Sequence, residues 1–251
     1  MIENNNVLIT RYMPYDRFID MCEKGLFVSN VALFHDIWEG LLGTIAVLDR
    51  NQIQKQREAV NIAKNSFFIS CWHKSSEENM AMWKVYGKKK ASVCVETTIA
   101  RLINCCIDYC KMQQSHNIWL SEIQYVSPYP DDLNGKRPMI LWDYWSSVNI
   151  NPKSQYNFVS IKTLQGLMFK HKTYSYEKEI RLICDTFMGS GKPFPINQTK
   201  GIHISLHKDF FQKVIFSPKS SPEMLEKADS ILNKYGYKNP IINMSAFQCI
   251  G

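Results

Sequence analysis

Residues 66–72 constrain the fold of this chain more than any other segment. Their sequence, Ser-Phe-Phe-Ile-Ser-Cys-Trp, is a dense apolar run of the length of a strand. A strand with one face in water alternates apolar and polar residues, whereas a run like this one is typical of a strand buried on both faces. The sequence therefore predicts a central strand in a sheet that is covered on both sides.

Helical and extended patterns are mixed irregularly along the rest of the chain. Tyr15, Phe18 and Cys22 recur at helical spacing, and Gly25 follows them as a cap. Further strands are predicted at 7–9, 26–28, 91–96, 174–185, 201–206, 213–217 and 241–247, and further helices at 52–64, 98–110, 155–170 and from Ser221 onward. This order predicts an α+β fold with a mixed or antiparallel central sheet and flanking helices.

A short helix is predicted directly after the central strand. Ser75 and Glu78 are three residues apart, which is the spacing of a capping box, and they precede a segment that carries Trp83 and Tyr86 and ends at Gly87. The two aromatic residues share one face of that helix. They can therefore pack in the core or flank a flat heteroaromatic ring, and the sequence leaves both interpretations open.

The length and composition indicate how many domains the chain forms and in which compartment it is found. The 251 residues are 45% hydrophobic and contain no internal repeat or flexible linker, so we expect a single domain over residues 1–251. Its irregular part, roughly 111–154, is interpreted as an aromatic-rich insertion. No apolar segment approaches the roughly 18 residues of a membrane span, and residues 1–6 lack the pattern of a secretory signal. We therefore expect a cytoplasmic protein that does not contact a membrane.

The charged residues and the cysteines indicate a reduced protein with an anionic partner. The 8 cysteines are too sparse for a disulfide scaffold and lack the paired spacing of a zinc site, so we expect no metal. The formal net charge of +7 fits a nucleic acid or a phosphate-bearing ligand. A solubilising surface explains the same charge, so charge alone does not identify the partner.

The strongest candidates for catalytic residues lie in the string Tyr174-Ser-Tyr-Glu177-Lys-Glu179-Ile-Arg181. Residues two apart in a strand point to the same face, so Glu177, Glu179 and Arg181 are expected to form one row with the carboxylates about 7 Å apart. The guanidinium can keep one carboxylate ionised while the pKa of the other rises, which suits acid/base work or the stabilisation of a cation. On an edge strand, the same row would be a solvent-facing charge ladder.

Three motifs resemble, in their order, a known class of enzymes. Arg11 follows the first predicted strand, Ser70 lies in the central strand, and Glu177-x-Glu179 comes later. This is the order of the Arg–Ser–Glu class of ADP-ribosyltransferases. The chain has Cys-Trp after Ser70 where those enzymes have Thr-Ser, and the longer connection to Glu177 fits the expected insertion. The chain also resembles a bacterial family whose domain was long catalogued as of unknown function. Four strings carry this second resemblance: Phe34-His-Asp36-Ile-Trp-Glu39, Ile69-Ser-Cys-Trp72, Met82-Trp-x-x-Tyr-Gly87 and Tyr174-x-x-Glu-x-Glu-x-Arg181.

The resemblance implies an ADP-ribosyltransferase-like fold and the transfer of ADP-ribose from NAD to a macromolecular acceptor, as a toxin or antiphage effector. It implies that Glu179 binds the ribose and stabilises its developing positive charge, and that Glu177 orients or deprotonates the acceptor. Arg11 is expected to hold the pyrophosphate or ribose. The other residues assigned to NAD, which is a substrate in this reaction, are Ser70, Tyr12, Trp83 and Tyr86.

The sequence does not identify the acceptor of the ADP-ribose, because RNA, DNA and protein all fit. Candidates for contact with it are Asp36, Glu39, Arg181 and Lys172. Asp36 and Glu39 can equally fix their own loop by hydrogen bonds to its backbone. An antitoxin or inhibitor protein is a further partner that the resemblance implies.

Two other functions remain as alternatives. The first is a metal-dependent nuclease in which Asp36, Glu39, Glu177 and Glu179 provide oxygen ligands for Mg²⁺. The second is a non-catalytic module that binds nucleic acid or protein, in which the Glu-x-Glu-x-Arg row is a structural network of salt bridges.

Overall fold

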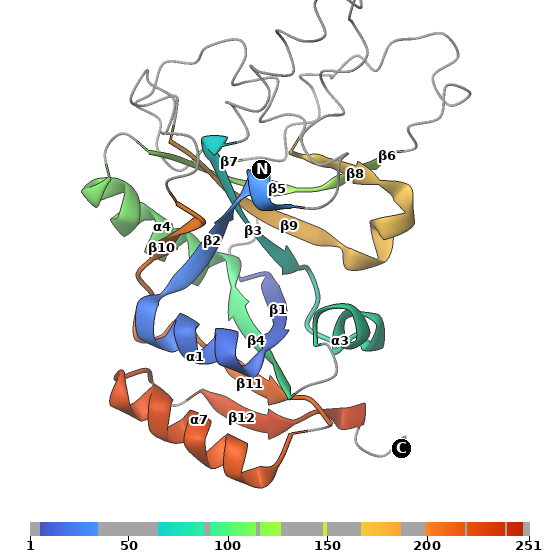
Figure 1. Cartoon of the computed structure of the whole chain (residues 1–251), viewed down its shortest axis with the longest axis vertical. Helices are drawn as coiled ribbons and strands as arrows, with labels where there is room; N and C mark the ends of the chain where they lie inside the picture. The colour runs from blue at the N-terminus through green and yellow to red at the C-terminus, as the bar shows by residue number, and fades with distance from the viewer. Residues whose placement is uncertain are drawn as a thin grey trace, which may run out of the picture. The chain divides into compact units, whose positions relative to one another are not determined.

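The computed structural model forms two compact units (Figure 1). It describes residues 6–34, 65–87, 91–113, 116–126, 148–149, 167–186, 199–218, 220–238 and 240–247. The first unit consists mainly of Val28–Cys71 and Cys110–Ile202, and the second of Glu3–Phe27, Trp72–Tyr109 and His203–Gly251. Within the described ranges, no helix is long and apolar enough to cross a membrane. The expected insertion lies largely outside these ranges, and the single domain stays a prediction.

The second unit is built on a sheet with antiparallel and parallel pairs. Its strands, in spatial order, are β12 (Ile241–Met244), β11 (Lys213–Phe216), β4 (Ser92–Thr98) and β1 (Leu8–Pro14). β11 and β12 run parallel, whereas β4 is antiparallel to both β11 and β1. Thr10 of β1 also pairs with His73 at the end of β3 (Phe67–His73). The helices α1 (Tyr15–Lys24), α3 (Met80–Tyr86), α7 (Pro222–Lys234) and most of α4 (Ile99–Met112) belong to this unit.

The helix α1 forms where its apolar spacing predicts it. Phe18, Met21 and Cys22 are buried on one face, and Gly25 follows the helix with a φ of 94°. Only glycine adopts this φ without strain, and a Cβ at this position would collide with the carbonyl oxygen of Ile204. The cap predicted at Gly25 is therefore confirmed.

The capping box predicted for α3 is wrong. The N-cap is Asn79, whose side-chain oxygen accepts hydrogen bonds from the backbone N–H groups of Ala81 (2.9 Å) and Met82 (3.3 Å). The Ser75 hydroxyl oxygen instead accepts a hydrogen bond from the N–H of Glu77 at 3.0 Å, which makes a local turn. Serine side chains form such turns readily, and in this case the turn takes the place of an early helix start.

We expect Asn79→Ala to lower the free energy of unfolding by about 1 kcal/mol, because it removes the acceptor for two helix N–H groups. Ser75→Ala is the matched control and should change it by less than about 0.5 kcal/mol. Urea denaturation of the two variants measures the difference. A larger loss for Ser75→Ala than for Asn79→Ala would contradict the observed cap.

The first unit is built around β9 (Glu179–Asp185). Its sheet has the order β3, β9, β5 (Asn117–Glu122) and β7 (Val148–Asn149), with β5 antiparallel to β9 and to β7. β2 (Leu26–Asn30), which precedes the 3-10 helix η1 (Val31–Leu33), is antiparallel to β3 and also pairs with β10 (Gly201–Ile204). A separate parallel pair joins β6 (Gln124–Val126) to β8 (Phe169–His171), and the 3-10 helix η5 (Lys172–Glu177) follows β8.

The expected central strand and fold class are confirmed. Six of the seven residues of β3 are buried, and Cys71 is half-buried. Phe67 and Ile69 of β3 pack in an apolar cluster of the first unit, whose other buried members are Val31, Trp119, Leu167, Met168 and Ile183. The structure is α+β, with a mostly antiparallel central sheet and flanking helices.

Two expected elements near the Glu-x-Glu string differ from the structure. The strand predicted at 174–185 is limited to Glu179–Asp185, because Lys172–Glu177 forms η5. The helix predicted at 155–170 does not reach its expected end, since Phe169–His171 is the strand β8. The helix predicted at 52–64 lies outside the described residues.

Candidate active site

A left-handed residue separates the two glutamates of the Glu-x-Glu string. Glu177 ends the 3-10 helix η5, Lys178 adopts φ 40° and ψ 52°, and β9 begins at Glu179. The prediction of a single row of three side chains on one strand is therefore wrong for Glu177. Glu179 and Arg181 do share one face of β9, because they are two residues apart in a regular strand.

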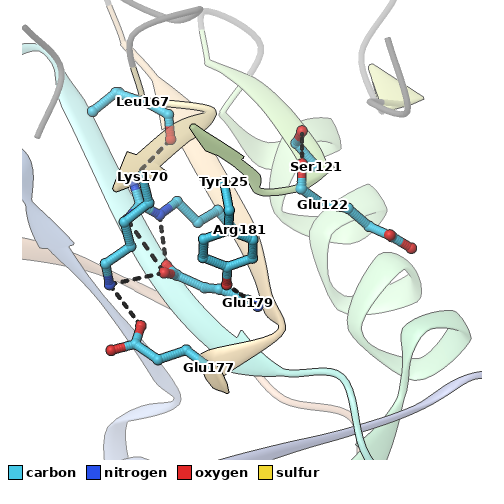
Figure 2. A network of polar contacts seen from close by, with 8 residues as sticks. All are labelled: Ser121, Glu122, Tyr125, Leu167, Lys170, Glu177, Glu179 and Arg181. Carbon is cyan, nitrogen blue, oxygen red and sulfur yellow. Dashed lines mark hydrogen bonds and ion pairs between the residues drawn. The ribbon is translucent and has the colours of Figure 1, made fainter. Parts of the chain in front are cut away.

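Lys170 nevertheless brings the two carboxylates together (Figure 2). Its Nζ lies 2.6 Å from Oε2 of Glu177 and 3.1 Å from Oε2 of Glu179. Nε of Arg181 is 2.6 Å from Oε1 of Glu179, and its Nη2 donates to Oε2 of Glu179 at 3.3 Å. Nη1 of Arg181 donates to the carbonyl oxygen of Leu167 at 2.8 Å. Two carboxylates and two cations thus form one cluster, which we call the Glu–Lys–Arg cluster (Lys170, Glu177, Glu179 and Arg181).

The Glu–Lys–Arg cluster is buried. The exposed fraction of the side chain is 0% for Arg181, 3% for Glu179, 5% for Glu177 and 12% for Lys170. β9 also lies between β3 and β5, so it is not an edge strand. The interpretation as a solvent-facing charge ladder is therefore wrong. Burial of ion pairs costs desolvation free energy, which close and well-oriented partners can offset.

Backbone contacts fix the start of β9. The N–H of Glu179 donates to the hydroxyl oxygen of Tyr125 at 2.7 Å, as Figure 2 shows, and its carbonyl oxygen accepts from the N–H of Ile123 at 2.9 Å. The N–H of Gln124 donates to the carbonyl oxygen of Met168 at 2.9 Å. Burial raises the pKa of Tyr125 to about 12, so this phenol is neutral at physiological pH. The segment that carries Glu179 is thus tied to β6 on one side.

Electrostatics keep Glu179 ionised. Burial alone would raise its pKa, but the charge and hydrogen bonds of Arg181, together with the charge of Lys170, hold the pKa of Glu179 well below its ordinary value. Burial alone would lower the pKa of Lys170, but Glu179 and Glu177 raise it above its ordinary value. At neutral pH, Glu179 is therefore a fixed negative charge and a weak base.

We expect the folded state to lose stability in acid, because protonation of Glu179 removes the stabilising contribution of its carboxylate. Its pKa is lower in the folded protein than the ordinary value of 4.5, so its contribution is fully present above pH 4.5 and is lost as the pH falls through the folded-state pKa. Urea denaturation at about pH 6 and about pH 3 measures this loss. The double variant Glu179→Gln/Arg181→Met lacks this ionisable group, so its stability should fall less. Equal losses in the two proteins would contradict the assignment.

Cys71 is a further group that lowers the pKa of the Glu179 carboxyl. The thiol of Cys71 forms a hydrogen bond with Glu179 that helps to lower the pKa of this carboxyl. Cys71 also packs against the apolar cluster of the first unit. Because side chains alternate along a strand, the buried Ser70 projects from the opposite face of β3. The residue that departs from the Thr-Ser pattern is therefore the one beside the glutamate.

Tyr12 and Trp83 pack in the core of the second unit. Their rings meet edge to face with centroids 4.8 Å apart. The Tyr12 hydroxyl oxygen accepts a hydrogen bond from the N–H of Asn79 at 2.8 Å, and Trp83 Nε1 donates to Oε2 of Glu78 at 3.1 Å. Burial raises the pKa of Tyr12 above its ordinary value. Tyr86 is partly buried at the edge of the same cluster. Core packing accounts for these positions, and a role in NAD binding stays a prediction.

Arg11 projects from the other face of β1. Its guanidinium carbon lies 5.8 Å from the centroid of the Trp72 ring, and its Nη1 donates to the carbonyl oxygen of Phe27 at 3.4 Å. Consecutive residues of a strand face opposite sides, so Arg11 and Tyr12 do not share a surface of the second unit. The role of Arg11 in binding NAD stays a prediction.

The four acceptor candidates differ in their surroundings. Lys172 is exposed on η5. Arg181 is fully buried and donates to the Glu179 carboxylate, and its contact with an acceptor stays a prediction. Asp36 and Glu39 lie outside the described residues. Within the described ranges, no group of three or more His, Cys, Asp or Glu side chains could hold a metal ion.

From the sequence, Lys170 is a candidate for a phosphate contact and not a partner of the two carboxylates, and Cys71 has no assigned role in this site. Lys170 lies in the strand β8 and Glu177 ends the 3-10 helix η5, so the two residues belong to different elements and no single periodic pattern of the sequence relates them. The departure from the Thr-Ser pattern drew attention to Cys71, but only the strand register reveals which side chain faces Glu179.

A family described as "Protein of unknown function (DUF2971)" matches residues 82–182. This segment is less than half of the 251 residues. It contains Trp83, Tyr86 and the Glu177-x-Glu179-x-Arg181 string. The expected resemblance to a family of unknown function is confirmed over this segment, which includes neither Arg11 nor Ser70. A comparison with curated proteins gives no match.

Solved structures of DarT from Thermus sp. 2.9 are distantly similar to this chain. They are described as complexes with NAD+, with ADP-ribosylated ssDNA and with carba-NAD+. The sequence identities are 6%, 8% and 7%, and the TM-scores are 0.35, 0.36 and 0.36. Each similarity covers 96% of this chain and 96%, 95% and 96% of the respective DarT chain.

Proposed function

We propose that this chain is an ADP-ribosyltransferase that transfers ADP-ribose from NAD to a macromolecular acceptor. The observation that carries the proposal is the buried Glu179 carboxylate, which Arg181 and Lys170 hold in its ionised form. Cleavage of the bond between nicotinamide and ribose develops positive charge on the ribose. A fixed carboxylate in a site of low dielectric constant stabilises such charge strongly. The order of Arg11, Ser70 and Glu177-x-Glu179 supports the same class of enzyme.

In the proposed reaction, the electron pair of the cleaved bond leaves with the nicotinamide nitrogen. Glu179 faces the resulting oxocarbenium-like ribose, and its low pKa suits this role because the carboxylate stays negative throughout. Glu177, which shares Lys170 with Glu179, orients the acceptor nucleophile. It takes the proton of the acceptor as the new bond to the ribose forms.

The other contacts with NAD are proposed from the resemblance. Arg11 would bind the pyrophosphate, for which a guanidinium is a suitable bidentate donor. Tyr86 is less buried than Tyr12 and Trp83, so it is the best candidate of the three to flank the nicotinamide. Ser70 completes the proposed set, although Cys71 has the contact with Glu179 that the class assigns to serine.

The acceptor we propose is a nucleic acid. Tyr174 and Tyr176 are 37% and 39% exposed on η5, directly before Glu177. Lys172 and Lys178 are exposed in the same segment. Exposed aromatic rings next to cations are typical of surfaces that stack bases and contact phosphates. The surface next to the Glu–Lys–Arg cluster thus fits the acceptor class that the net charge of +7 also favours.

The biological role that follows from the resemblance is that of a toxin or antiphage effector in the cytoplasm. An inhibitor protein or antitoxin would then be a partner of this chain. These statements rest on the resemblance alone and depend on the enzymatic activity.

The activity is tested with NAD that carries a label in its adenylate phosphate. The purified protein is incubated with labelled NAD and, separately, with single-stranded DNA, RNA and a protein extract. We expect transfer of the label to nucleic acid, with less transfer by the Tyr174→Ala/Tyr176→Ala variant. Magnesium-dependent cleavage of nucleic acid without NAD turnover would favour the nuclease instead. Salt-sensitive binding without either reaction would favour the binding module.

A further inference from the structure

The backbone does not align the two glutamates of the Glu–Lys–Arg cluster. Glu179 belongs to the buried strand β9, whereas Glu177 ends η5, a 3-10 helix of 6 residues. The left-handed Lys178 lies between them, so the regular geometry of a strand does not relate the two side chains. The relative position of their carboxylates therefore depends on contacts with other side chains.

Lys170 is held in place beside Glu179 by the pairing of β8 with β6. Lys170 pairs in register with Tyr125 across these parallel strands, so the two side chains lie on the same face of the pair. The Tyr125 hydroxyl oxygen accepts a hydrogen bond from the N–H of Glu179 at 2.7 Å, and Lys170 Nζ lies 3.1 Å from Oε2 of Glu179 (Figure 2). Two neighbouring side chains of one strand pair thus hold the backbone and the carboxylate of Glu179.

Among the described residues, the ammonium group of Lys170 contacts two carboxylates and one aromatic ring. Its Nζ lies 2.6 Å from Oε2 of Glu177 and 3.1 Å from Oε2 of Glu179, and 4.9 Å from the centroid of the Tyr174 ring. An ammonium group has three N–H donors, which is enough for both carboxylates and the face of the ring. Only 12% of the Lys170 side chain is exposed, so water competes little for these donors. Lys170 therefore ties Glu177 to Glu179.

We propose that Lys170 is a positioning residue that holds Glu177 beside Glu179 and thereby directs ADP-ribose to the acceptor instead of to water. This inference rests on the proposed function, in which Glu179 faces the ribose cation. The electron pair of the cleaved bond leaves with the nicotinamide nitrogen, the acceptor forms the new bond to the ribose, and its proton passes to Glu177. When water takes the place of the acceptor, the products are free ADP-ribose and a proton that is released to solvent.

Loss of Lys170 should affect the two steps unequally. Cleavage of NAD depends on Glu179, which keeps its two hydrogen bonds from Arg181. Activation of the acceptor depends on the position of Glu177, for which Lys170 is a close ion-pair partner. Water is abundant and reacts with an oxocarbenium-like ribose without a positioned base. Without Lys170, more of the ADP-ribose should therefore leave as the product of hydrolysis.

The ratio of ADP-ribose transferred to nicotinamide released measures this partition. Lys170→Met should lower the rate of transfer by about 100-fold and the release of nicotinamide by less than about 10-fold, because only the transfer needs the positioned base. Lys170→Gln keeps an N–H donor without the charge, so it should lower the ratio to a smaller extent, and it replaces Lys170→Met if that variant does not fold. Lys170→Arg keeps a cation with donors for both carboxylates and should keep most of the transfer.

Lys200→Met is the matched control for these variants. Lys200 is an exposed lysine of the same unit, and no ion pair joins it to another of the described residues. Its replacement should leave the ratio of transfer to nicotinamide release at the wild-type value. A role that is only structural would lower both rates together in the Lys170 variants and leave their ratio unchanged.

Nuclear magnetic resonance tests the contact itself without turnover. In wild-type protein with isotope-labelled lysine and glutamate, an ammonium group that donates to a carboxylate shows scalar coupling between Nζ and the carboxylate carbon. We expect coupling from Lys170 to both Glu177 and Glu179. The Lys170 signal is identified by its loss in the Lys170→Arg variant, and Lys200 should show no such coupling.

Each outcome bears on one part of the proposal. A Lys170 ammonium group without coupling to Glu177 overturns the positioning contact. If the coupling is present but the folded Lys170 variants keep the wild-type ratio, Lys170 does not direct ADP-ribose to the acceptor. If the wild type releases no nicotinamide, the proposed function fails and the role of Lys170 in transfer fails with it, while the coupling still decides whether Lys170 joins the two glutamates.

Discussion

Replacing Arg181 with methionine is expected to lower the free energy of unfolding by about 3–5 kcal/mol. The guanidinium is fully buried and gives Glu179 a close ion pair and a second hydrogen bond. Methionine fills much of the volume, but it leaves the carboxylate with fewer partners inside the protein. An uncompensated buried charge is among the largest penalties that a single substitution can cause. Urea denaturation at neutral pH measures the loss.

Two controls show whether the loss comes from the buried charge. The double variant Glu179→Gln/Arg181→Met removes both charges and should recover most of the lost stability, because a neutral replacement of a whole buried pair is often tolerated. Arg17 is an exposed arginine of α1, and Arg17→Met should change the stability by less than about 0.5 kcal/mol. A loss for Arg181→Met no larger than that for Arg17→Met would contradict the role of the cluster.

Glu179→Gln is expected to reduce the transfer of ADP-ribose by about 100- to 1,000-fold. Glutamine keeps the size of the side chain and an acceptor oxygen, but it removes the negative charge that faces the ribose in the proposed transition state. The loss should therefore appear mainly in kcat, with a smaller change in KM for NAD. Steady-state kinetics with labelled NAD and the preferred acceptor measure both constants.

Glu122→Gln is the matched control for this substitution. Glu122 ends β5 in the same unit, and Figure 2 shows its carboxylate pointing away from the Glu–Lys–Arg cluster. Its kinetics should stay within about 2-fold of the wild type. Circular dichroism of the Glu179→Gln variant shows whether it is folded. A folded Glu179→Gln variant with wild-type kcat would remove Glu179 from the mechanism.

The fold class could be predicted from the sequence because local patterns of apolar residues predict the strands and helices that define it. The apolar run around Ile69 identifies a strand buried on both faces, and the spacing of Phe18 and Cys22 before Gly25 identifies a helix with its cap. The start of α3 could not be predicted in the same way. Ser75 and Asn79 are both good caps, and the choice between them depends on a turn and on a contact with Tyr12 from a distant strand.

The candidate site could be predicted only in part. The Glu-x-Glu-x-Arg string identified the two carboxylates and the guanidinium, but their alignment on one strand was wrong because Lys178 adopts a left-handed conformation. Lys170 reaches the two carboxylates only in the tertiary structure, and no pattern along the sequence predicts this contact. Ser70 and Cys71 are neighbours in the sequence, and only the pairing of β3 with β9 decides which of them meets Glu179.

The most direct test of the proposed activity is the release of nicotinamide from NAD by the purified protein, measured together with the incorporation of ADP-ribose into an acceptor. The proposal predicts that wild-type protein releases one nicotinamide for each ADP-ribose transferred, and that Glu179→Gln loses both in parallel. NAD that stays intact with single-stranded DNA, RNA and protein acceptors alike would contradict the assignment of this chain as an ADP-ribosyltransferase.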